Sequence, residues 1–393
     1  MTDQPVADTS THRYPDSPIY LDYAATTPVD PRVAEKMLEF MTQRFGNPAS
    51  VSHSFGMDAA MAVEMARAQV ARLINVSAAE IVWTSGATES NNLALKGVAH
   101  ALRERGRHLV TVTTEHKSVL DSMRRLERQG FEVTYLRPGS DGLLDPNEFA
   151  GALRDDTVLA SVMLVNNEIG VVQPIAALSE ICRRKNVFLH VDAVQAAGKL
   201  PVDARELGAD LMSLSAHKVY GPKGVGALYV RSAPELRLEA QIDGGGHEQG
   251  RRSGTLATHQ IVGMGIAFEI ARRELQEESA RITALRGLLE SGLSAIPGVH
   301  FNGCVRQRVA HNLNVSFAGA RAGIPEQLLA KVAVSGGSAC NSASAGPSYV
   351  LKELGLSDEL ARNAIRISIG RFTTDEEIRF VLEQLRQSMS HYS

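Results

Sequence analysis

The chain has 393 residues, a length that predicts two or three domains at roughly 150 residues each. Its 41 basic and 44 acidic residues give a formal net charge of −3, which provides no general attraction to nucleic acid or to an anionic membrane. Three cysteines without a repeated spacing exclude a disulfide framework and a four-thiolate zinc site, and no metal is expected. With 44% hydrophobic and 22% charged residues, the composition is that of an ordinary globular protein.

The first 16 residues are polar and include three aspartates and one arginine. A secretory signal needs an apolar run, and a transit peptide is normally rich in arginine and poor in acids, so neither is predicted. The most apolar stretch, 158–165, is far shorter than the roughly 20 residues that cross a bilayer. We therefore expect a cytoplasmic protein in which residues 1–16 are an extension, packed near a small C-terminal domain or disordered.

Helical patterns at 31–40 and 57–73 precede a regular alternation of short apolar strands and helices. Strands are predicted at 81–84, 108–113, 133–136, 158–165, 187–192, 211–215 and 227–230, and intervening helices include 91–105, 118–129 and 175–184. Strands that are apolar on both faces and separated by helices indicate a mostly parallel sheet covered on both sides. A Gly-rich stretch at 244–254, a long helix at 259–296 and a second region of strands and helices follow. We expect a large α/β domain over residues 17–275 and a smaller α+β domain over residues 276–393.

Ligands of an open parallel sheet bind beyond the carboxyl ends of its strands, so polar residues at those ends are candidates. The first predicted strand runs into Ser-Gly-Ala-Thr-Glu-Ser at 85–90, where helix-start N–H groups and hydroxyls suit a phosphate. A helix cap explains the same residues. His116 follows the second strand and Asn167 follows the fourth, where a cap and a turn are the structural alternatives.

Asp192 ends the strand at 187–192, and Lys218 follows the strand at 211–215. A buried aspartate needs a cationic partner or a cap, and a lysine before a Gly-rich loop is a candidate Schiff-base amine, although most lysines are surface residues. Taken together, the strand ends supply phosphate donors, a stacking ring, a carboxylate for a pyridinium nitrogen and an amine for an aldehyde. Pyridoxal phosphate requires this set of groups. A dinucleotide site is disfavoured because no G-x-G-x-x-G motif opens a first helix.

Cys340 lies in a run of small residues, 335–348, that has no large apolar side chain to anchor it. This composition predicts a mobile loop, and a flexible connection that happens to contain a thiol is the structural alternative. An exposed thiol risks oxidation, which favours a functional role. Only a few per cent of an unperturbed thiol is thiolate at pH 7, so a nucleophile here would need a nearby cation or proton acceptor.

Seven motifs occur in order along the chain: YLDYAATTP at 20–28, FGNP at 45–48, TSGATES at 84–90, VNNEIG at 165–170, SAHKVYGPKG at 215–224, RSGT at 252–255 and SAC at 338–340. In these motifs the chain resembles the cysteine desulfurases of the NifS/IscS type, which are class V aminotransferases within the fold-type I pyridoxal-phosphate enzymes. The resemblance runs from about residue 19 to the C-terminus. It implies a large domain with a mostly parallel sheet and a smaller α+β domain that carries the cysteine loop.

The resemblance also implies a mechanism. Lys218 would hold pyridoxal 5'-phosphate and move the α-proton of L-cysteine, while His116 would stack on the ring and assist acid–base steps. Cys340 would attack the substrate sulfur, leaving a persulfide on the enzyme and releasing L-alanine. Catalytic roles therefore fall on Cys340, Lys218 and His116.

Binding roles follow from the same resemblance. Asp192 would pair with the ring nitrogen, Gln195 with the phenolic oxygen, and Arg366 with the substrate carboxylate. Thr255 would reach the phosphate of the neighbouring subunit's cofactor in a homodimer. The implied cofactor-binding residues are Ala87, Thr88, His116, Asn167, Asp192, Gln195, Ser215, His217, Lys218 and Thr255, and the implied substrate-binding residues are Asn47, Asn167 and Arg366.

Several alternatives stay open at this point. The sulfur acceptor is expected to be a protein, either an iron–sulfur scaffold or a carrier for tRNA or other thiolation. The chain ends without the longer tail that docks a scaffold in assembly members of the family, so scaffold docking is left open. A selenocysteine lyase, or another class V lyase or aminotransferase, is the alternative activity. An aminotransferase has no use for Cys340 in a mobile loop. A catalytically silent partner with the same fold would not need Lys218, Asp192 and His116.

Overall fold

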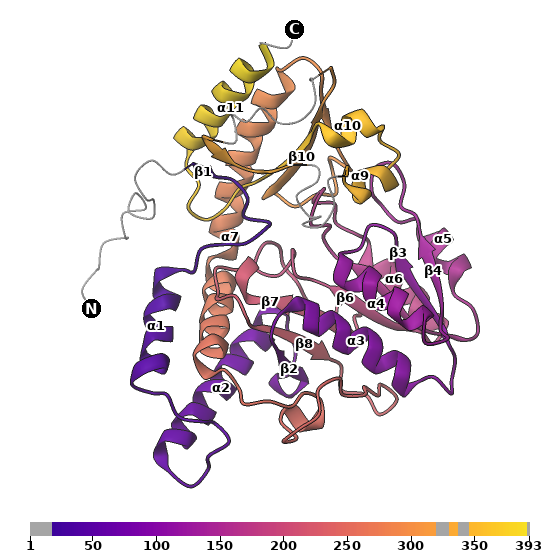
Figure 1. Ribbon diagram of the computed structural model, residues 1–393, viewed down its shortest axis with the longest axis vertical. Helices are drawn as coiled ribbons and strands as arrows, with labels where there is room; N and C mark the ends of the chain where they lie inside the picture. The colour runs from indigo at the N-terminus through magenta and orange to yellow at the C-terminus, as the bar shows by residue number, and fades with distance from the viewer. Residues whose placement is uncertain (1–17, 320–329, 337–345, 391–393) are drawn as a thin grey trace.

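A seven-stranded sheet forms the centre of the computed structural model, which describes residues 18–319, 330–336 and 346–390 (Figure 1). Its strand order is β2-β8-β7-β6-β5-β3-β4. The strands are β2 (Ile81–Thr84), β3 (His108–Val112), β4 (Glu132–Leu136), β5 (Thr157–Met163), β6 (Phe188–Asp192), β7 (Leu211–Ser215) and β8 (Gly226–Val230). Among these strands β8 runs opposite to the other six and pairs antiparallel with both β2 and β7, while the remaining pairs are parallel, so the predicted mostly parallel sheet is confirmed.

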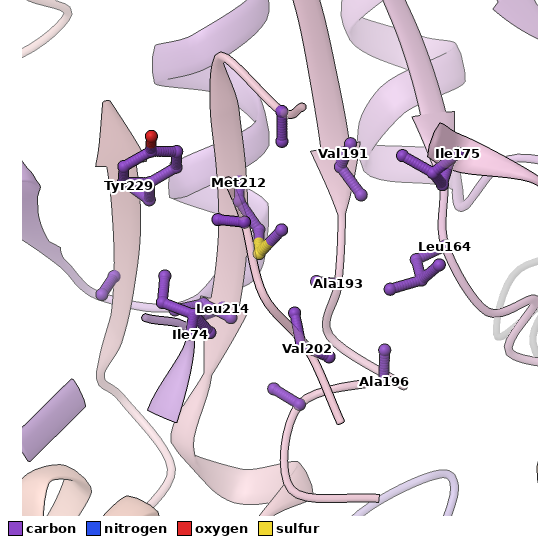
Figure 2. Packing of buried hydrophobic residues seen from close by; sticks show 14 of the residues in the cluster. Ile74, Leu164, Ile175, Val191, Ala193, Ala196, Val202, Met212, Leu214 and Tyr229 are labelled. Carbon is purple, nitrogen blue, oxygen red and sulfur yellow. The ribbon is translucent and has the colours of Figure 1, made fainter. Parts of the chain in front are cut away.

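Both faces of the sheet are apolar, because successive side chains along each strand point to opposite sides. Val191, Met212 and Leu214 pack in one cluster (Figure 2), whereas Leu211 and Leu228 belong to a cluster on the other side. The first cluster is covered by α2 (Ser54–Leu73), α6 (Ile175–Arg184) and the start of α7 (Thr258–Ser294), and the second by α3 (Ala87–Ala101) and α4 (Lys117–Glu127).

Two helices flank this layered arrangement. The helix α1 (Pro31–Thr42) packs against α7, and a short helix that the sequence pattern did not predict, α5 (Pro146–Ala152), packs against α6. Asp145 caps α5 by accepting a hydrogen bond from the backbone N–H of Asn147, and a proline occupies the first turn. The helix α5 is only seven residues long, too short for its apolar residues to show a clear helical periodicity.

The C-terminal part of the chain builds a separate four-stranded antiparallel sheet. Its order is β12 (Ser335–Gly336), β13 (Ala364–Ser368), β10 (Asn312–Phe317) and β9 (Val299–Phe301). The sheet packs against the end of α7 and against α11 (Asp375–Ser390), while α9 (Tyr349–Glu353) and α10 (Asp358–Arg362) lie beside it (Figure 1). The N-terminal strand β1 (Ile19–Tyr20) joins this region by pairing with β11 (Val332–Ala333).

The helix α7 is continuous through both regions: its first half packs on α1 and α2, and its second half lies in the C-terminal core. The predicted domain boundary at residue 275 therefore falls inside a helix, and the division into 17–275 and 276–393 stays a prediction. Residues 1–16 lie outside the described part of the chain. No helix among the described residues is long and apolar enough to cross a membrane.

A buried ion network ties the two regions together. The guanidinium of Arg371, which follows β13, pairs with Asp30 at 2.7 Å and with Glu278 of α7 at 2.8 Å. It also lies 4.2 Å from the centre of the Tyr220 ring. Burial by itself lowers the pKa of Arg371, but the interactions with Glu278, Tyr220 and Asp30 more than offset this and raise it, so the guanidinium remains charged.

Replacement of Arg371 by alanine should strongly destabilise the protein, because the buried carboxylate of Glu278 would lose its paired cation and Asp30 would keep only Arg32. We expect a loss of about 3–5 kcal/mol in the free energy of unfolding, measured by urea denaturation. The matched control is Arg124→Ala, which removes an exposed ion pair with Asp121 and should change stability by less than about 1 kcal/mol. Equal effects of the two substitutions would contradict the assigned importance of the buried network.

Candidate active site

A cavity of about 780 Å³ opens at the carboxyl ends of the parallel strands. Ten of the residues singled out from the sequence line it: Ala87, Thr88, His116, Asn167, Asp192, Gln195, Ser215, His217, Lys218 and Arg366. Asp192 and Ser215 end strands of the large sheet, the others except Arg366 follow strands of that sheet in the chain, and Arg366 comes from β13 of the small sheet. The topology therefore brings together side chains that are far apart in the sequence.

One wall of the cavity is the beginning of α3. This helix starts at Ala87, four residues earlier than predicted, so Ala87 and Thr88 lie in its first turn. Its N-cap is Gly86, which has a φ of 152° and no side chain to cap the helix. A Cβ at this position would meet nothing within 4 Å, so the helix end stands open beside the cavity. Unpaired N–H groups and the positive end of the helix dipole favour an anion such as a phosphate.

Asp192, the last residue of β6, lies on the cavity wall and is only 4% exposed. One carboxylate oxygen accepts a hydrogen bond from the backbone N–H of Val194 at 3.1 Å, and the other accepts one from the amide of Asn91 at 2.9 Å. These donors are neutral, and a buried carboxylate is stabilised far better by a cation. A protonated pyridine nitrogen would supply that cation.

Lys218 lies at the end of a short 3-10 helix directly after β7. Its ammonium donates hydrogen bonds to the backbone carbonyls of Ala24 and Ala25, at 2.7 and 2.6 Å. Gln195 binds the same turn through the carbonyl of Ala24. The neighbouring His217 is held by Thr26 at 3.1 Å, and burial together with Lys218 lowers its pKa to about 4, so it is neutral at pH 7.

Arg366 brings a cation to the cavity from the small sheet, and it is 4% exposed. Its guanidinium donates to the backbone oxygen of Asn167 at 2.9 Å and to the carboxylate of Asp22 at 2.7 Å. Ser335 also contacts both Arg366 and Asp22, each at 2.8 Å. The site therefore already shows a carboxylate bound to this guanidinium, which is the kind of group that an amino-acid substrate presents.

The residues present fit pyridoxal phosphate on the chemistry of the donor set. One cavity is lined by an open helix end, by a buried carboxylate whose hydrogen-bond donors are neutral, by a lysine and by the ring of His116. Asp22, Ser335 and Asn91 were not predicted. Asp22 stands in a quoted motif, but its contact with Arg366 joins residues 344 positions apart and has no local signal.

Of the three remaining predicted residues, two are not brought to the cavity. Cys340 lies outside the described residues. Asn47 is exposed on the loop between α1 and α2, where its side chain accepts a hydrogen bond from the backbone N–H of Ala49. Thr255 is also exposed and does not line the cavity. Its loop is nevertheless tied to the start of α3, because Arg252 pairs with Glu89 at 2.8 Å.

Beneath the cavity, β6 carries a buried histidine two residues before Asp192. His190 bridges Ser161 and Ser213 on the neighbouring strands, at 2.8 and 2.9 Å. Burial lowers its pKa to about 4, against the opposing effect of the Asp192 charge, so it is neutral in the folded protein.

This histidine should make the protein sensitive to acid. In the unfolded chain the pKa of this histidine is about 6.5, so on acidification the unfolded state takes up a proton before the folded state does. The stability that is present above pH 6.5 is therefore lost as the pH falls toward 4. The loss attributable to His190 is roughly 3 kcal/mol. Urea denaturation across this pH range should show a shallower pH dependence for His190→Gln, whereas the exposed control His300→Gln should follow the wild type. An unchanged dependence for His190→Gln would contradict the assignment.

Comparisons with known proteins identify relatives of this chain. The family model of the class-V aminotransferases matches residues 19–381. The cysteine desulfurase IscS of Methylobacillus flagellatus is 60% identical over 95% of this chain and 92% of its own. A solved NifS-like protein superimposes with a TM-score of 0.88 at 38% identity, covering 95% of this chain and 100% of its own. A second structure, SspA in complex with cysteine, has a TM-score of 0.81 at 38% identity and covers 91% of this chain and 100% of its own.

Proposed function

The chain belongs to the aminotransferase class-V family, and from this membership we propose how its residues carry out the desulfuration of L-cysteine. The chain is a pyridoxal-phosphate-dependent cysteine desulfurase, as the 60% identity to IscS over nearly its whole length establishes. The observation that carries the residue assignment is the convergence of Lys218, Asp192 and Arg366 on one cavity. Bound pyridoxal phosphate would supply an acceptor for the electrons released when the substrate loses its α-proton.

Each residue then has a defined task. Arg366 binds the α-carboxylate of L-cysteine as a two-pronged donor, in exchange for or beside Asp22. The backbone oxygen of Asn167 accepts a hydrogen bond from Arg366. Asn167 therefore lies beside the bound carboxylate and orients the substrate. Lys218 carries the α-proton, and Asp192 keeps a positive charge on the ring nitrogen. The first turn of α3, with Ser215 and His217, holds the phosphate.

Cys340 receives the sulfur. Its thiolate forms a bond to the substrate sulfur while the carbon–sulfur bond breaks, the bonding electrons stay with the carbon, and that carbon takes up a proton to give L-alanine. Ser335 lines the cavity, and five residues of chain span at most about 18 Å, so the covalent chain keeps Cys340 within reach. The persulfide is then passed to an acceptor protein, an iron–sulfur scaffold or a thiolation carrier.

The second subunit of a homodimer completes the site. Thr255 and Asn47 are exposed in the single chain, so both are open to a partner. Apolar side chains are exposed nearby on α1, on α2 and on the loop between them: Leu38, Met41, Phe45, Val51, Phe55, Met57, Met61 and Met65. Three of these methionines recur at four-residue spacing, which forms a stripe along one face of α2. An apolar surface of this extent supports burial against a second copy.

The sulfur transfer can be tested by product analysis with L-cysteine and a reductant. The wild type should release sulfide and alanine in equal amounts, and Cys340→Ala should lose both while keeping the visible absorption of the bound cofactor. Lys218→Ala should lose that absorption and roughly 10²–10⁴-fold in rate. The matched control Cys304→Ala, which removes a loop thiol, should behave as the wild type. A Cys340→Ala enzyme as fast as wild type would contradict the persulfide step.

The contribution of Thr255 across the dimer can be tested by coexpressing two variants with different tags. Thr255→Val and Lys218→Ala should each be weak as homodimers. In a mixed dimer, one site would combine the intact Lys218 of the first chain with the intact Thr255 of the second. A random mixture should therefore recover about a quarter of the wild-type rate. Activity no greater than the average of the two homodimers would place Thr255 in its own subunit's site and contradict the proposal.

A further inference from the structure

A chain of buried hydrogen bonds runs behind the cavity and connects His116 to Asp192. His116 is the N-cap of α4, and its Nδ1 lies 3.2 Å from the backbone N–H of Ser118 and 2.8 Å from the Ser118 hydroxyl. The amide nitrogen of Asn91 on α3 donates to that hydroxyl at 2.8 Å and to Asp192 at 2.9 Å. Asn91 is fully buried and Ser118 is 9% exposed.

The direction of each hydrogen bond follows from its donors. The Ser118 backbone N–H can only donate, so Nδ1 of His116 must accept it and cannot carry a proton. The Asp192 carboxylate needs a donor, and this fixes the Asn91 side chain with its NH₂ group toward Asp192. The second N–H of the same group then points at the Ser118 oxygen, which leaves the Ser118 hydroxyl proton to be donated to Nδ1.

The orientation of the Asn91 side-chain amide leaves its carbonyl oxygen without a hydrogen bond among the described residues, which by itself is unfavourable. Its carbonyl oxygen is buried and makes no hydrogen bond to any residue that the structure describes. A reversed amide would bring this oxygen against the Asp192 carboxylate, where two acceptors would face each other. The two bonds donated by the nitrogen therefore outweigh the unpaired carbonyl.

Resting on the roles assigned above to His116 and Asp192, we propose that Asn91 and Ser118 are positioning residues that keep His116 neutral with its proton on Nε2. Because Nδ1 is engaged by Ser118, Nε2 would be the ring nitrogen that donates a hydrogen bond toward the cavity that His116 lines. The start of α4 adds to this, because the positive end of a helix disfavours a charged imidazole.

The surroundings of His116 agree with a neutral ring. Enclosure by the cavity walls lowers its pKa, and the Asp192 charge opposes this shift. The other charges that act on the ring are Lys218 after β7, and Lys117 and Asp121 on α4. Glu115, the preceding residue, is buried, and burial raises its pKa well above the usual range.

The test is the ¹⁵N spectrum of histidine-labelled protein, recorded with and without cofactor, with the His116 signals assigned by their loss in His116→Gln. The wild type should show an unprotonated Nδ1 and a protonated Nε2 in both forms. Ser118→Ala removes one of the two donors and should raise the pKa of His116 by up to about one unit. Asn91→Ala frees the Ser118 hydroxyl to accept from a protonated Nδ1, so it should raise the pKa further and mix the two tautomers.

The matched control is Asn92→Ala, the next residue of α3, whose exposed amide donates to the backbone oxygen of Thr88. It should leave the tautomer and the pKa of His116 as in wild type. A proton on Nδ1 in the wild type would overturn the proposal, as would an unchanged tautomer and pKa in Ser118→Ala. If Asn91→Ala does not fold, Ser118→Ala, a smaller change, still decides the question.

The outcome is separable from the desulfurase mechanism, because the spectrum of the cofactor-free protein does not depend on turnover. Loss of alanine release with the expected tautomer would count against the mechanism alone. Normal turnover with a proton on Nδ1 would count against the positioning roles of Asn91 and Ser118 alone.

Discussion

The arrangement of the active site depends on one buried charge, the carboxylate of Asp192 at the end of an apolar strand. A carboxylate that is 4% exposed is unfavourable unless donors and a cation surround it. The backbone of Val194 and the amide of Asn91 supply donors, and the pyridine nitrogen of the cofactor would supply the cation. The site is thus built to gain stability when the cofactor binds, since the cofactor completes the compensation of this charge.

A second constraint is that Arg366, the cation proposed to bind the substrate, comes from the other sheet. Arg366 belongs to β13, yet it donates to the backbone of Asn167, which follows β5 of the large sheet. Its partner Asp22 lies just after β1, the strand that joins the C-terminal region. Binding of a substrate carboxylate therefore acts on a junction between the two sheets. The network around Arg371 adds a second set of buried charges that connects the C-terminal region to the rest of the chain.

Sequence patterns predicted the main strands and their polar ends well, because strands buried on both faces are continuous apolar runs and a parallel sheet gathers their carboxyl ends at one edge. Asp192 and Lys218 were predicted as site residues for this reason. Asn91 and Ser118 were not, because a polar residue on a helix and a serine beside a helix start are ordinary surface and capping features. The contact of Asp22 with Arg366 depends on tertiary structure alone. In the proposed homodimer, Thr255 and Asn47 would act only together with a second chain, and no single-chain pattern distinguishes them from exposed loop residues.

The hydrogen-bond chain behind the cavity gives the site a division of labour in proton transfer. With its proton on Nε2, a neutral His116 can donate a hydrogen bond there but cannot accept a proton. In the proposed mechanism, a proton that leaves the thiol of Cys340 or of the substrate must then go to another group. The carbon that becomes the methyl group of L-alanine needs one further proton, and Lys218, which becomes an ammonium on taking up the α-proton, can supply it, because a neutral imidazole that lost its Nε2 proton would be left as an imidazolate. The neutral amide of Asn91 thus links the Asp192 carboxylate to the ring whose tautomer it fixes, so both are set by one buried side chain.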